Sequence, residues 1–204
     1  KQKTAYEIGV RLVGSEMCIR DRIGFESINA ESQEFVHKRV NKVGGYPELM
    51  RKLHDAGIVV QGCFAFGGDD EDASVFERTV EMVAETQIDL PRYSILTPFP
   101  NTALYRQLEG EGRIFEHDWA MYDVEHVVFR PAKMTEEQLD AGITWAWDQT
   151  YTLPAITKRL APYDRALLPS LVTNLFGYRG YAKKFHQFPR ERMVDNSDVP
   201  RVDR

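Results

Sequence analysis

The sequence predicts an α/β fold, in which three parallel strands and their crossover helices form half of a TIM-type barrel. Apolar strand-like segments alternate with amphipathic helical segments over residues 23–112, an order that produces a parallel sheet. Three such units are too few to close a barrel. Residues 113–186 are aromatic-rich and then helical, so we expect a mainly helical C-terminal extension. The charged, proline-bearing residues 187–204 are predicted to be disordered.

Residues 1–22 are expected not to belong to the native protein. KQKTAYE can be encoded as AAGCAGAAGACGGCATACGAG, which resembles a flow-cell adapter of short-read sequencing. LVGSEMCIRD can be encoded as CTCGTGGGCTCGGAGATGTGTATAAGAGAC, which resembles the read adapter of a transposase-built library. The alternatives are a frayed terminus or an expression scar. We therefore expect the native protein to start near Ile23, continuing from an upstream part, and Cys18 not to be a native cysteine.

Composition argues against several classes of partner. The chain has 26 basic and 31 acidic residues, and five of the basic and three of the acidic residues lie in the first 22, so the remainder has a net charge of −7. An acidic balance argues against a nucleic-acid-binding surface. No run of eighteen apolar residues occurs, so no transmembrane segment is predicted. Cys63 is then the single native cysteine, which suits a reducing cytoplasm.

Three strands are predicted from short, bounded, apolar runs: IGFESI at 23–28, IVVQGCFAF at 58–66 and RYSILTP at 92–98. The second run is nearly all apolar, as expected for a strand covered on both faces of a parallel sheet.

Helices are predicted between and after these strands. The first two cover residues 31–40 and 46–56, and Gly57 is a natural stop for the second. Ser74 followed by Glu77 resembles a capping box that begins a third helix.

In the remainder of the chain, Asn101 or Thr102 can cap a fourth helix. VVFRP at 127–131 could add a strand. A long helix is expected over about 135–152 and one more helical piece within 164–186.

The carboxyl ends of the strands are where parallel α/β folds bind ligands. Glu26 lies inside an apolar strand and needs a partner or a ligand, because burying a lone carboxylate is costly. It could pair with a lysine or accept hydrogen bonds from ribose hydroxyls. Gly62 and Gly67-Gly68 remove side chains and allow a flat ring to lie against the backbone. The alternative is a turn that needs a positive φ.

Other candidate residues favour structural roles. The acidic residues 69–72 could bind a divalent metal, but such clusters are more often solvated and favour the N-terminus of the next helix. The five histidines show no zinc-ligand spacing and are expected to be packed or exposed. Trp145 and Trp147 are expected in a core or an interface. No metal ligand and no catalytic side chain is therefore predicted.

Taken together, these segments resemble the C-terminal half of a radical SAM enzyme, in the subgroup with a cobalamin-binding domain and a C-terminal extension. GFESINAESQEFVHKRVNK (24–42) resembles the family's fourth strand and following helix. GCFAFGGDDED (62–72) resembles its fifth-strand motif, glycine-x-hydrophobic-x-x-glycine with a later glutamate. LTPFPNTALYRQLEGEGR (96–113) resembles its sixth strand, usually written PFPGT-x-LY, and HVVFRPAKMTEEQL (126–139) the region after the barrel. The resemblance covers about residues 23–160.

The resemblance implies a site for S-adenosylmethionine. Glu26 and Ser27 match positions that contact the ribose or the amino-acid part, and Lys38, with Arg39 as its rival, matches a basic position suited to the methionine carboxylate. The second strand end matches the part that packs beside adenine, and the third the segment that borders the base. The implied cofactor-binding residues are Glu26, Ser27, Lys38, Gly62, Phe66, Gly67, Pro98 and Phe99.

Three departures from the family pattern are clear. The family's cluster cysteines, spaced CxxxCxxC, precede the first strand and are expected upstream of Ile23, and neither Cys18 nor Cys63 can replace them, because a cubane needs several converging thiolates. Asn101 stands where the family has glycine, and Asn tolerates the left-handed conformation almost as well. The cobalamin domain is also absent.

By resemblance, the parent enzyme cleaves S-adenosylmethionine reductively at a [4Fe-4S] cluster, and the radical formed abstracts a hydrogen from its substrate. Cobalamin-dependent methyl transfer is one expected outcome. The substrate is expected to be a small or lipid-like molecule, and the electron donor a protein such as flavodoxin or ferredoxin. The chain alone is expected to be inactive. Two other hypotheses stay open: a small α/β nucleotide-binding protein without redox chemistry, and an interaction module with residues 113–186 as a docking domain.

Overall fold

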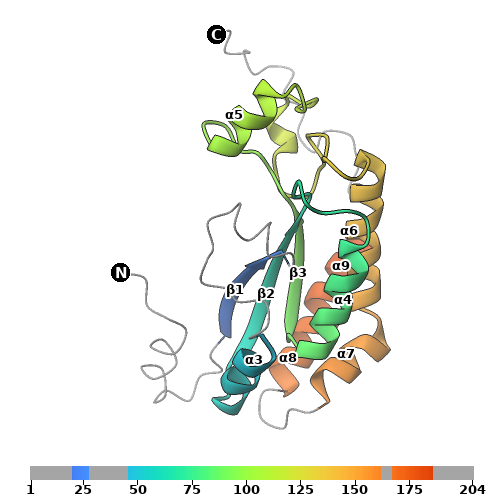
Figure 1. Cartoon of the computed structure of the whole chain (residues 1–204). Helices are drawn as coiled ribbons and strands as arrows, with labels where there is room; N and C mark the ends of the chain where they lie inside the picture. The colour runs from blue at the N-terminus through green and yellow to red at the C-terminus, as the bar shows by residue number, and fades with distance from the viewer. Residues whose placement is uncertain (1–19, 28–45, 162–166, 186–204) are drawn as a thin grey trace.

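The computed structural model of this chain describes residues 20–27, 46–161 and 167–185 (Figure 1). Most of the expected adapter segment, the predicted helix 31–40 with Lys38 and Arg39, and the predicted tail 187–204 lie outside the described residues.

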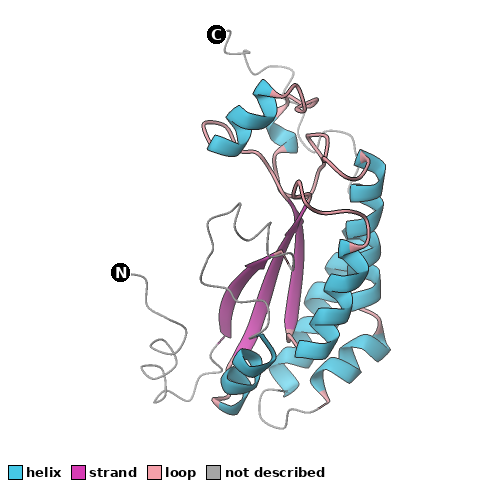
Figure 2. Cartoon of the chain, viewed as in Figure 1, coloured by secondary structure: helices cyan, strands magenta, loops and turns pink. Residues whose placement is uncertain are grey.

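The three described strands form one parallel sheet, which confirms the predicted α/β class. β1 (Arg20–Glu26), β2 (Val59–Phe66) and β3 (Leu90–Ile95) lie in the order β1-β2-β3. All three run in the same direction, with β2 in the centre. The three strands sit beside a layer of helices in Figure 2.

The strand boundaries differ from the predicted ones for reasons of backbone geometry. β1 begins three residues early, because Arg20 already pairs with Val59 and a backbone ladder does not depend on side-chain identity. β3 runs from Leu90 to Ile95 rather than over 92–98. It ends early because the chain turns, with the Phe99 N–H donating to the Thr97 carbonyl at 3.0 Å.

The helices follow the predicted order along the chain. Their bounds are α3 Tyr46–Asp55, α4 Val75–Thr86, α5 Ala103–Gly110, the 3-10 turn η2 Trp119–Met121, α6 Glu136–Thr150, α7 Leu153–Leu160, α8 Leu167–Val172, the π-helical η3 Thr173–Tyr178 and α9 Arg179–Phe185.

Several predicted helix ends are confirmed by local geometry. Gly57 follows α3 with a φ of 74°, the left-handed conformation expected of a stop. Thr102 caps α5 by accepting from the Tyr105 N–H at 3.1 Å. Thr135 and Gln138 form a complete capping box at the start of α6.

Two local predictions were wrong. The Ser74 hydroxyl does not cap α4, because it donates to the Asp72 carboxylate at 2.6 Å. The VVFRP segment does not form a strand, since its pairing is limited to one antiparallel bridge between Ile114 and Phe129.

The main core lies between the sheet and the helices. Alternate residues of β2, namely Val60, Phe64 and Phe66, are buried with Tyr93 and Ile95 of β3. Their rings meet at close range, and the centroids of Phe66 and Tyr93 lie 5.6 Å apart. Burial of these large apolar side chains supplies the main driving force for joining the two layers.

Trp147 of α6 attaches the extension to the sheet. It is fully buried, as predicted for a core residue, whereas Trp145 is 40% exposed. Its ring packs edge-on against Tyr93, with centroids 5.4 Å apart, and stacks on Tyr151. The Tyr151 hydroxyl in turn donates to the Pro91 carbonyl of β3. Residues of the C-terminal extension are therefore part of the main core that covers the sheet.

Across the described ranges, no helix has both the length and the apolar character that a membrane crossing would need.

Gly142 marks a close contact between α6 and α4. A Cβ placed there would lie 2.1 Å from Cε2 of Phe76, a buried ring of α4. We expect Gly142→Ala to lower the free energy of unfolding by about 1–3 kcal/mol, because overpacking forces the ring or the helix to shift. Denaturant unfolding measures the change. Gly110→Ala, where a Cβ meets nothing within 4 Å, is the matched control and should not destabilise. Equal stability of both variants would contradict the packing shown by this structure.

Candidate functional site

The carboxyl ends of the three strands lie at one edge of the sheet. Ile95 at the end of β3 pairs with Phe66 at the end of β2, and the Leu96 N–H donates to the Phe66 carbonyl at 2.8 Å. Glu26 at the end of β1 is in register with Phe64, after an irregularity that follows Gly24. The structure therefore brings the three predicted strand ends together along one edge.

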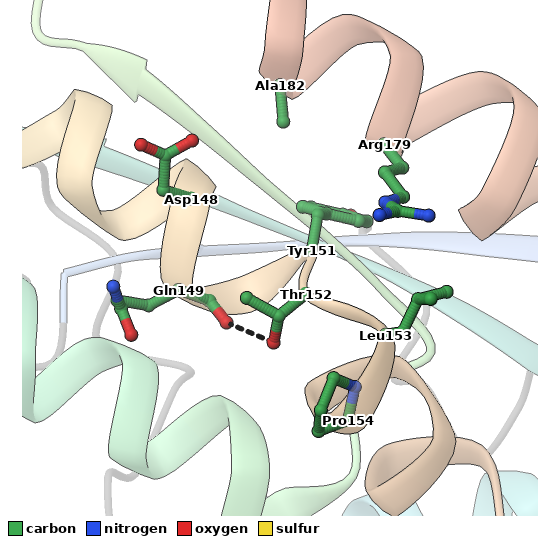
Figure 3. Close-up of a pocket in the computed structure, with 8 residues that line it drawn as sticks. All are labelled: Asp148, Gln149, Tyr151, Thr152, Leu153, Pro154, Arg179 and Ala182. Atoms are coloured by element: carbon green, nitrogen blue, oxygen red, sulfur yellow. Dashed lines mark hydrogen bonds between the residues drawn. The ribbon is translucent and has the colours of Figure 1, made fainter.

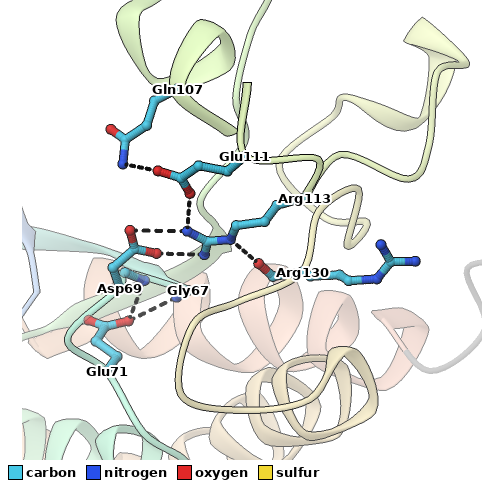
Figure 4. A network of polar contacts seen from close by, with 8 residues as sticks. Gly67, Asp69, Glu71, Gln107, Glu111, Arg113 and Arg130 are labelled. Atoms are coloured by element: carbon cyan, nitrogen blue, oxygen red, sulfur yellow. Dashed lines mark hydrogen bonds and ion pairs between the residues drawn. The ribbon is translucent and has the colours of Figure 1, made fainter. Parts of the chain in front are cut away.

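A buried carboxylate joins two of these strand ends. Glu71 accepts a hydrogen bond from the Ser27 hydroxyl at 2.5 Å. Its second carboxylate oxygen accepts from the backbone N–H groups of Gly67 and Gly68, at 2.8 and 3.0 Å. Figure 4 shows this carboxylate beneath the loop that follows β2. The side chain thus ties the loop after β2 to the end of β1.

Burial raises the pKa of Glu71, because desolvation disfavours its charged form. The hydrogen bonds from Ser27, Gly67 and Gly68 oppose this by stabilising the carboxylate, while the nearby charge of Asp70 adds to the upward shift. Desolvation outweighs the three donors, so the net direction is upward.

Arg113 makes a second polar tie across the same loop. Its guanidinium grips Asp69 with two hydrogen bonds, at 2.6 and 3.2 Å, and Glu111 with a third at 2.9 Å. Its Nε donates to the Arg130 carbonyl at 2.8 Å (Figure 4). The paired carboxylates raise the pKa of Arg113. This residue connects the loop after β2 with the segment after α5 and the extension.

The acidic cluster therefore divides into separate structural roles. Glu71 is buried, Asp69 pairs with Arg113, and Asp72 accepts from Ser74. In the described part of the chain, no three His, Cys, Asp or Glu side chains are grouped to hold a metal. The interpretation of residues 69–72 as a solvated loop was thus wrong for Glu71. The sequence analysis did not identify Glu71 as the residue whose hydrogen bonds hold this edge together.

Two predicted site residues have internal partners. The Ser27 side chain is buried and donates to Glu71. The side chain of Phe66 lies in the core against Phe76, with ring centroids 4.8 Å apart. A ligand at the edge could reach Phe66 only through its backbone.

The two predicted glycines differ in position. Gly67 has a φ of 111°, which disfavours any other residue, and a Cβ there would lie 3.2 Å from both Leu139 and Phe129. Gly62 lies in mid-strand, where a Cβ would lie 2.9 Å from Ile88, so close packing explains this glycine.

The third strand end presents an exposed ring. Pro98 is buried, whereas Phe99 is 46% exposed. Asn101 has a φ of 64°, which confirms that this position adopts the left-handed conformation. The backbone of Glu26 is described at the end of β1, and Lys38 lies outside the described residues.

The sheet face opposite to the main core carries small side chains near this edge. Ala65 and Ser94 are register partners, and strand alternation places them opposite to the core residues Phe64 and Tyr93. Both are only partly buried, and the Ser94 hydroxyl donates to the Phe64 carbonyl at 3.0 Å. Small residues at a strand end allow a flat group to lie against the backbone.

An iron–sulfur cluster does not fit the described residues. Cys63 is the one cysteine among them, and a cubane needs several converging thiolates.

A separate hollow lies in the extension, away from the strand ends. It has a volume of about 430 Å³ and is lined by residues of α6, α7, α9 and the connection between α6 and α7, among them Tyr151, Leu153 and Arg179 (Figure 3). It contains none of the residues predicted for cofactor binding.

The sequence of this chain is similar to those of several known enzymes. No family model matches it. It is 34% identical to bacteriochlorophyllide d C-12(1)-methyltransferase of Chlorobaculum tepidum over 149 residues, 73% of this chain and 32% of that protein. Identity is 25% to bacteriochlorophyllide d C-8(2)-methyltransferase of the same organism, over 84% of this chain and 38% of the relative. The chain is 27% identical to anaerobic magnesium-protoporphyrin IX monomethyl ester cyclase of Cereibacter sphaeroides, over 59% of this chain and 19% of that relative.

The chain spans between a fifth and two fifths of the length of these relatives. The relatives are enzymes, and they support the relationship to the radical SAM superfamily that the strand-end motifs indicate.

The raised pKa of Glu71 predicts a pH dependence of stability. A carboxyl whose folded pKa lies above its unfolded value stabilises the fold at low pH and loses that contribution as the pH rises through the folded pKa. The free energy of unfolding of the wild type, relative to Glu71→Gln, should therefore fall as the pH rises above 4.5, the ordinary pKa of this carboxyl. Chemical unfolding at several pH values measures it.

Asp72→Asn is the control of opposite sign, because the Ser74 hydrogen bonds lower the pKa of Asp72. If the wild type gained stability relative to Glu71→Gln as the pH rose, the three donors would outweigh desolvation and the assignment would be wrong.

Proposed function

We propose that this chain is part of a radical SAM enzyme that modifies a tetrapyrrole, and that the shared edge of its strand ends binds S-adenosylmethionine. The observation that carries the proposal is the 34% identity to a bacteriochlorophyllide methyltransferase over 73% of the chain. The parallel strand ends, which carry the motifs in the expected order, support it.

In this proposal the described sheet supplies the last three strands of a TIM-type barrel. Residues 23–112 are the native part of that half barrel, residues 113–186 its extension and residues 187–204 a tail. Residues 1–22 derive from adapter in this proposal, so the first three residues of β1, Arg20 to Arg22, would pair with β2 in place of native residues. The relatives are much longer than the matched region, which supports the assignment to part of a larger protein.

The geometry of the edge narrows which groups could meet the cofactor. Ser27 and the N–H of Gly67 are engaged by Glu71, so they shape the edge from within. Glu26 remains the candidate for the ribose hydroxyls, because carboxylates accept from ribose in dinucleotide sites. The backbone around Pro98 and the exposed Phe99 would border the base. Lys38 remains the candidate for the methionine carboxylate.

The proposed reaction would need a cluster and an electron donor that the described residues do not supply. We propose that the whole enzyme holds a [4Fe-4S] cluster on cysteines upstream of Ile23, cleaves S-adenosylmethionine reductively there, and takes electrons from a donor such as flavodoxin or ferredoxin. Two of the relatives are methyltransferases, which favours methyl transfer, with cobalamin as the proposed methyl carrier. The chain alone would be inactive, and we place the enzyme in the cytoplasm.

The substrate class follows from the relatives' names. Two act on a bacteriochlorophyllide and one on a magnesium protoporphyrin ester. All are planar tetrapyrroles, so we propose a tetrapyrrole as the substrate here.

Glu26→Ala tests the cofactor site. We expect about a tenfold loss in affinity for S-adenosylmethionine in the full protein, because hydrogen bonds to a charged group contribute about 1.5–3 kcal/mol. Isothermal titration calorimetry measures the affinity, and circular dichroism checks that the variant folds.

Glu77→Ala, which removes an exposed glutamate of α4, is the matched control and should bind as the wild type does. A folded Glu26→Ala variant with unchanged affinity would show that Glu26 is structural. Preference of the wild type for ATP over S-adenosylmethionine would favour a nucleotide-binding protein without redox chemistry.

A further inference from the structure

A strained turn lies beside the last residue of β3. The Ile95 N–H donates to the Val124 carbonyl at 2.7 Å, so the segment from Asp123 to His126 runs alongside the strand end. Val124 has a φ of 67°, an unfavourable conformation for a β-branched residue. Such strain persists only where surrounding contacts impose it, and it is common at functional sites.

Asp123 builds this turn and orients a histidine. One carboxylate oxygen accepts from the backbone N–H groups of Glu125 and His126, at 2.9 and 3.1 Å. The other lies 2.9 Å from Nδ1 of His126. A proton on Nδ1 that is donated to Asp123 leaves the lone pair on Nε2, so the turn selects one tautomer of the ring.

The turn leaves the lone pair of His126 Nε2 available to a metal ion. Both oxygens of Asp123 are engaged, and the Glu125 carboxylate accepts from the Tyr181 hydroxyl. Among the described residues none hydrogen-bonds to Nε2, and the His126 side chain is 11% exposed.

We propose that Nε2 of His126 is the axial ligand to the central metal of a metallated tetrapyrrole substrate, an inference that rests on the proposed function. Neutral imidazole is the commonest protein ligand for metals, and histidine holds the metal of haem axially. A ligating histidine almost always donates its other N–H to a carboxylate or carbonyl, as His126 can to Asp123. One protein ligand suffices, because the macrocycle supplies the others.

The position suits a substrate beside the proposed cofactor edge. Three residues beyond His126, the Phe129 ring packs beside Gly67 at the end of β2. On the other side of the turn, Trp119 is 53% exposed and its ring lies 4.9 Å from that of Tyr122, the residue before Asp123. An exposed ring of this kind offers a flat surface for a planar macrocycle.

The experiment compares magnesium protoporphyrin IX monomethyl ester with its metal-free form as probes. Each is titrated into the wild type, His126→Ala and Asp123→Asn, followed by the absorption bands of the macrocycle and by tryptophan quenching. We expect the wild type to bind the magnesium form more tightly and to shift its bands. His126→Ala should lose at least about tenfold in affinity for that form alone, and free imidazole should restore the band shift. Asp123→Asn should weaken it by about tenfold.

His117→Ala is the matched control, since His117 is an exposed histidine of the same segment. It should bind both forms as the wild type does. Equal binding of the two forms by the wild type, or an unchanged band shift in His126→Ala, would overturn the ligand assignment and leave the tetrapyrrole proposal standing. Binding of neither form by the wild type would overturn the substrate class as well.

Discussion

The buried carboxylate of Glu71 is the constraint on which the strand-end edge depends. A buried carboxylate is costly unless hydrogen bonds replace its lost hydration. Glu71 recovers them from Ser27 and from the backbone of Gly67 and Gly68, which belong to two different strand ends. The loop after β2 therefore cannot move without breaking contacts to β1. The backbone N–H groups of the glycine-rich turn are thus directed at the buried carboxylate of Glu71. A ligand at this edge would have to contact other groups.

The extension makes the other side of this edge. Arg113 joins Asp69 to the Arg130 carbonyl, and Trp147 packs against Tyr93 of β3. The turn at Asp123 then lies against the end of β3 through Val124. Residues that sequence motifs assign to a separate extension thus supply one wall of the proposed site. In the proposed arrangement, the sheet would bind the cofactor and the extension would contact the substrate.

Much of the fold was predictable because the responsible interactions are local. Apolar periodicity marks helices and strands wherever one face is buried, and caps such as Thr102 and Thr135 act within one helical turn. The site was less predictable, because its geometry depends on neighbours distant in sequence. In the sequence, nothing distinguishes Glu71 from its acidic neighbours. Its role depends on Ser27, which lies 44 residues away in the chain and beside it in the fold. His126 likewise shows no spacing signal, since its significance comes from the Asp123 turn beside β3.

The central claim is that the strand ends, and not the hollow of the extension, bind the adenosyl group. A nuclear magnetic resonance titration of the isotopically labelled protein with S-adenosylhomocysteine, a stable analogue without the transferable methyl group, tests it directly. Amide shifts should change most at residues 24–27, 65–68 and 96–99. Changes confined to residues 148–154 and to Arg179 would place the ligand in the hollow between α6, α7 and α9 and contradict the assignment of the strand ends.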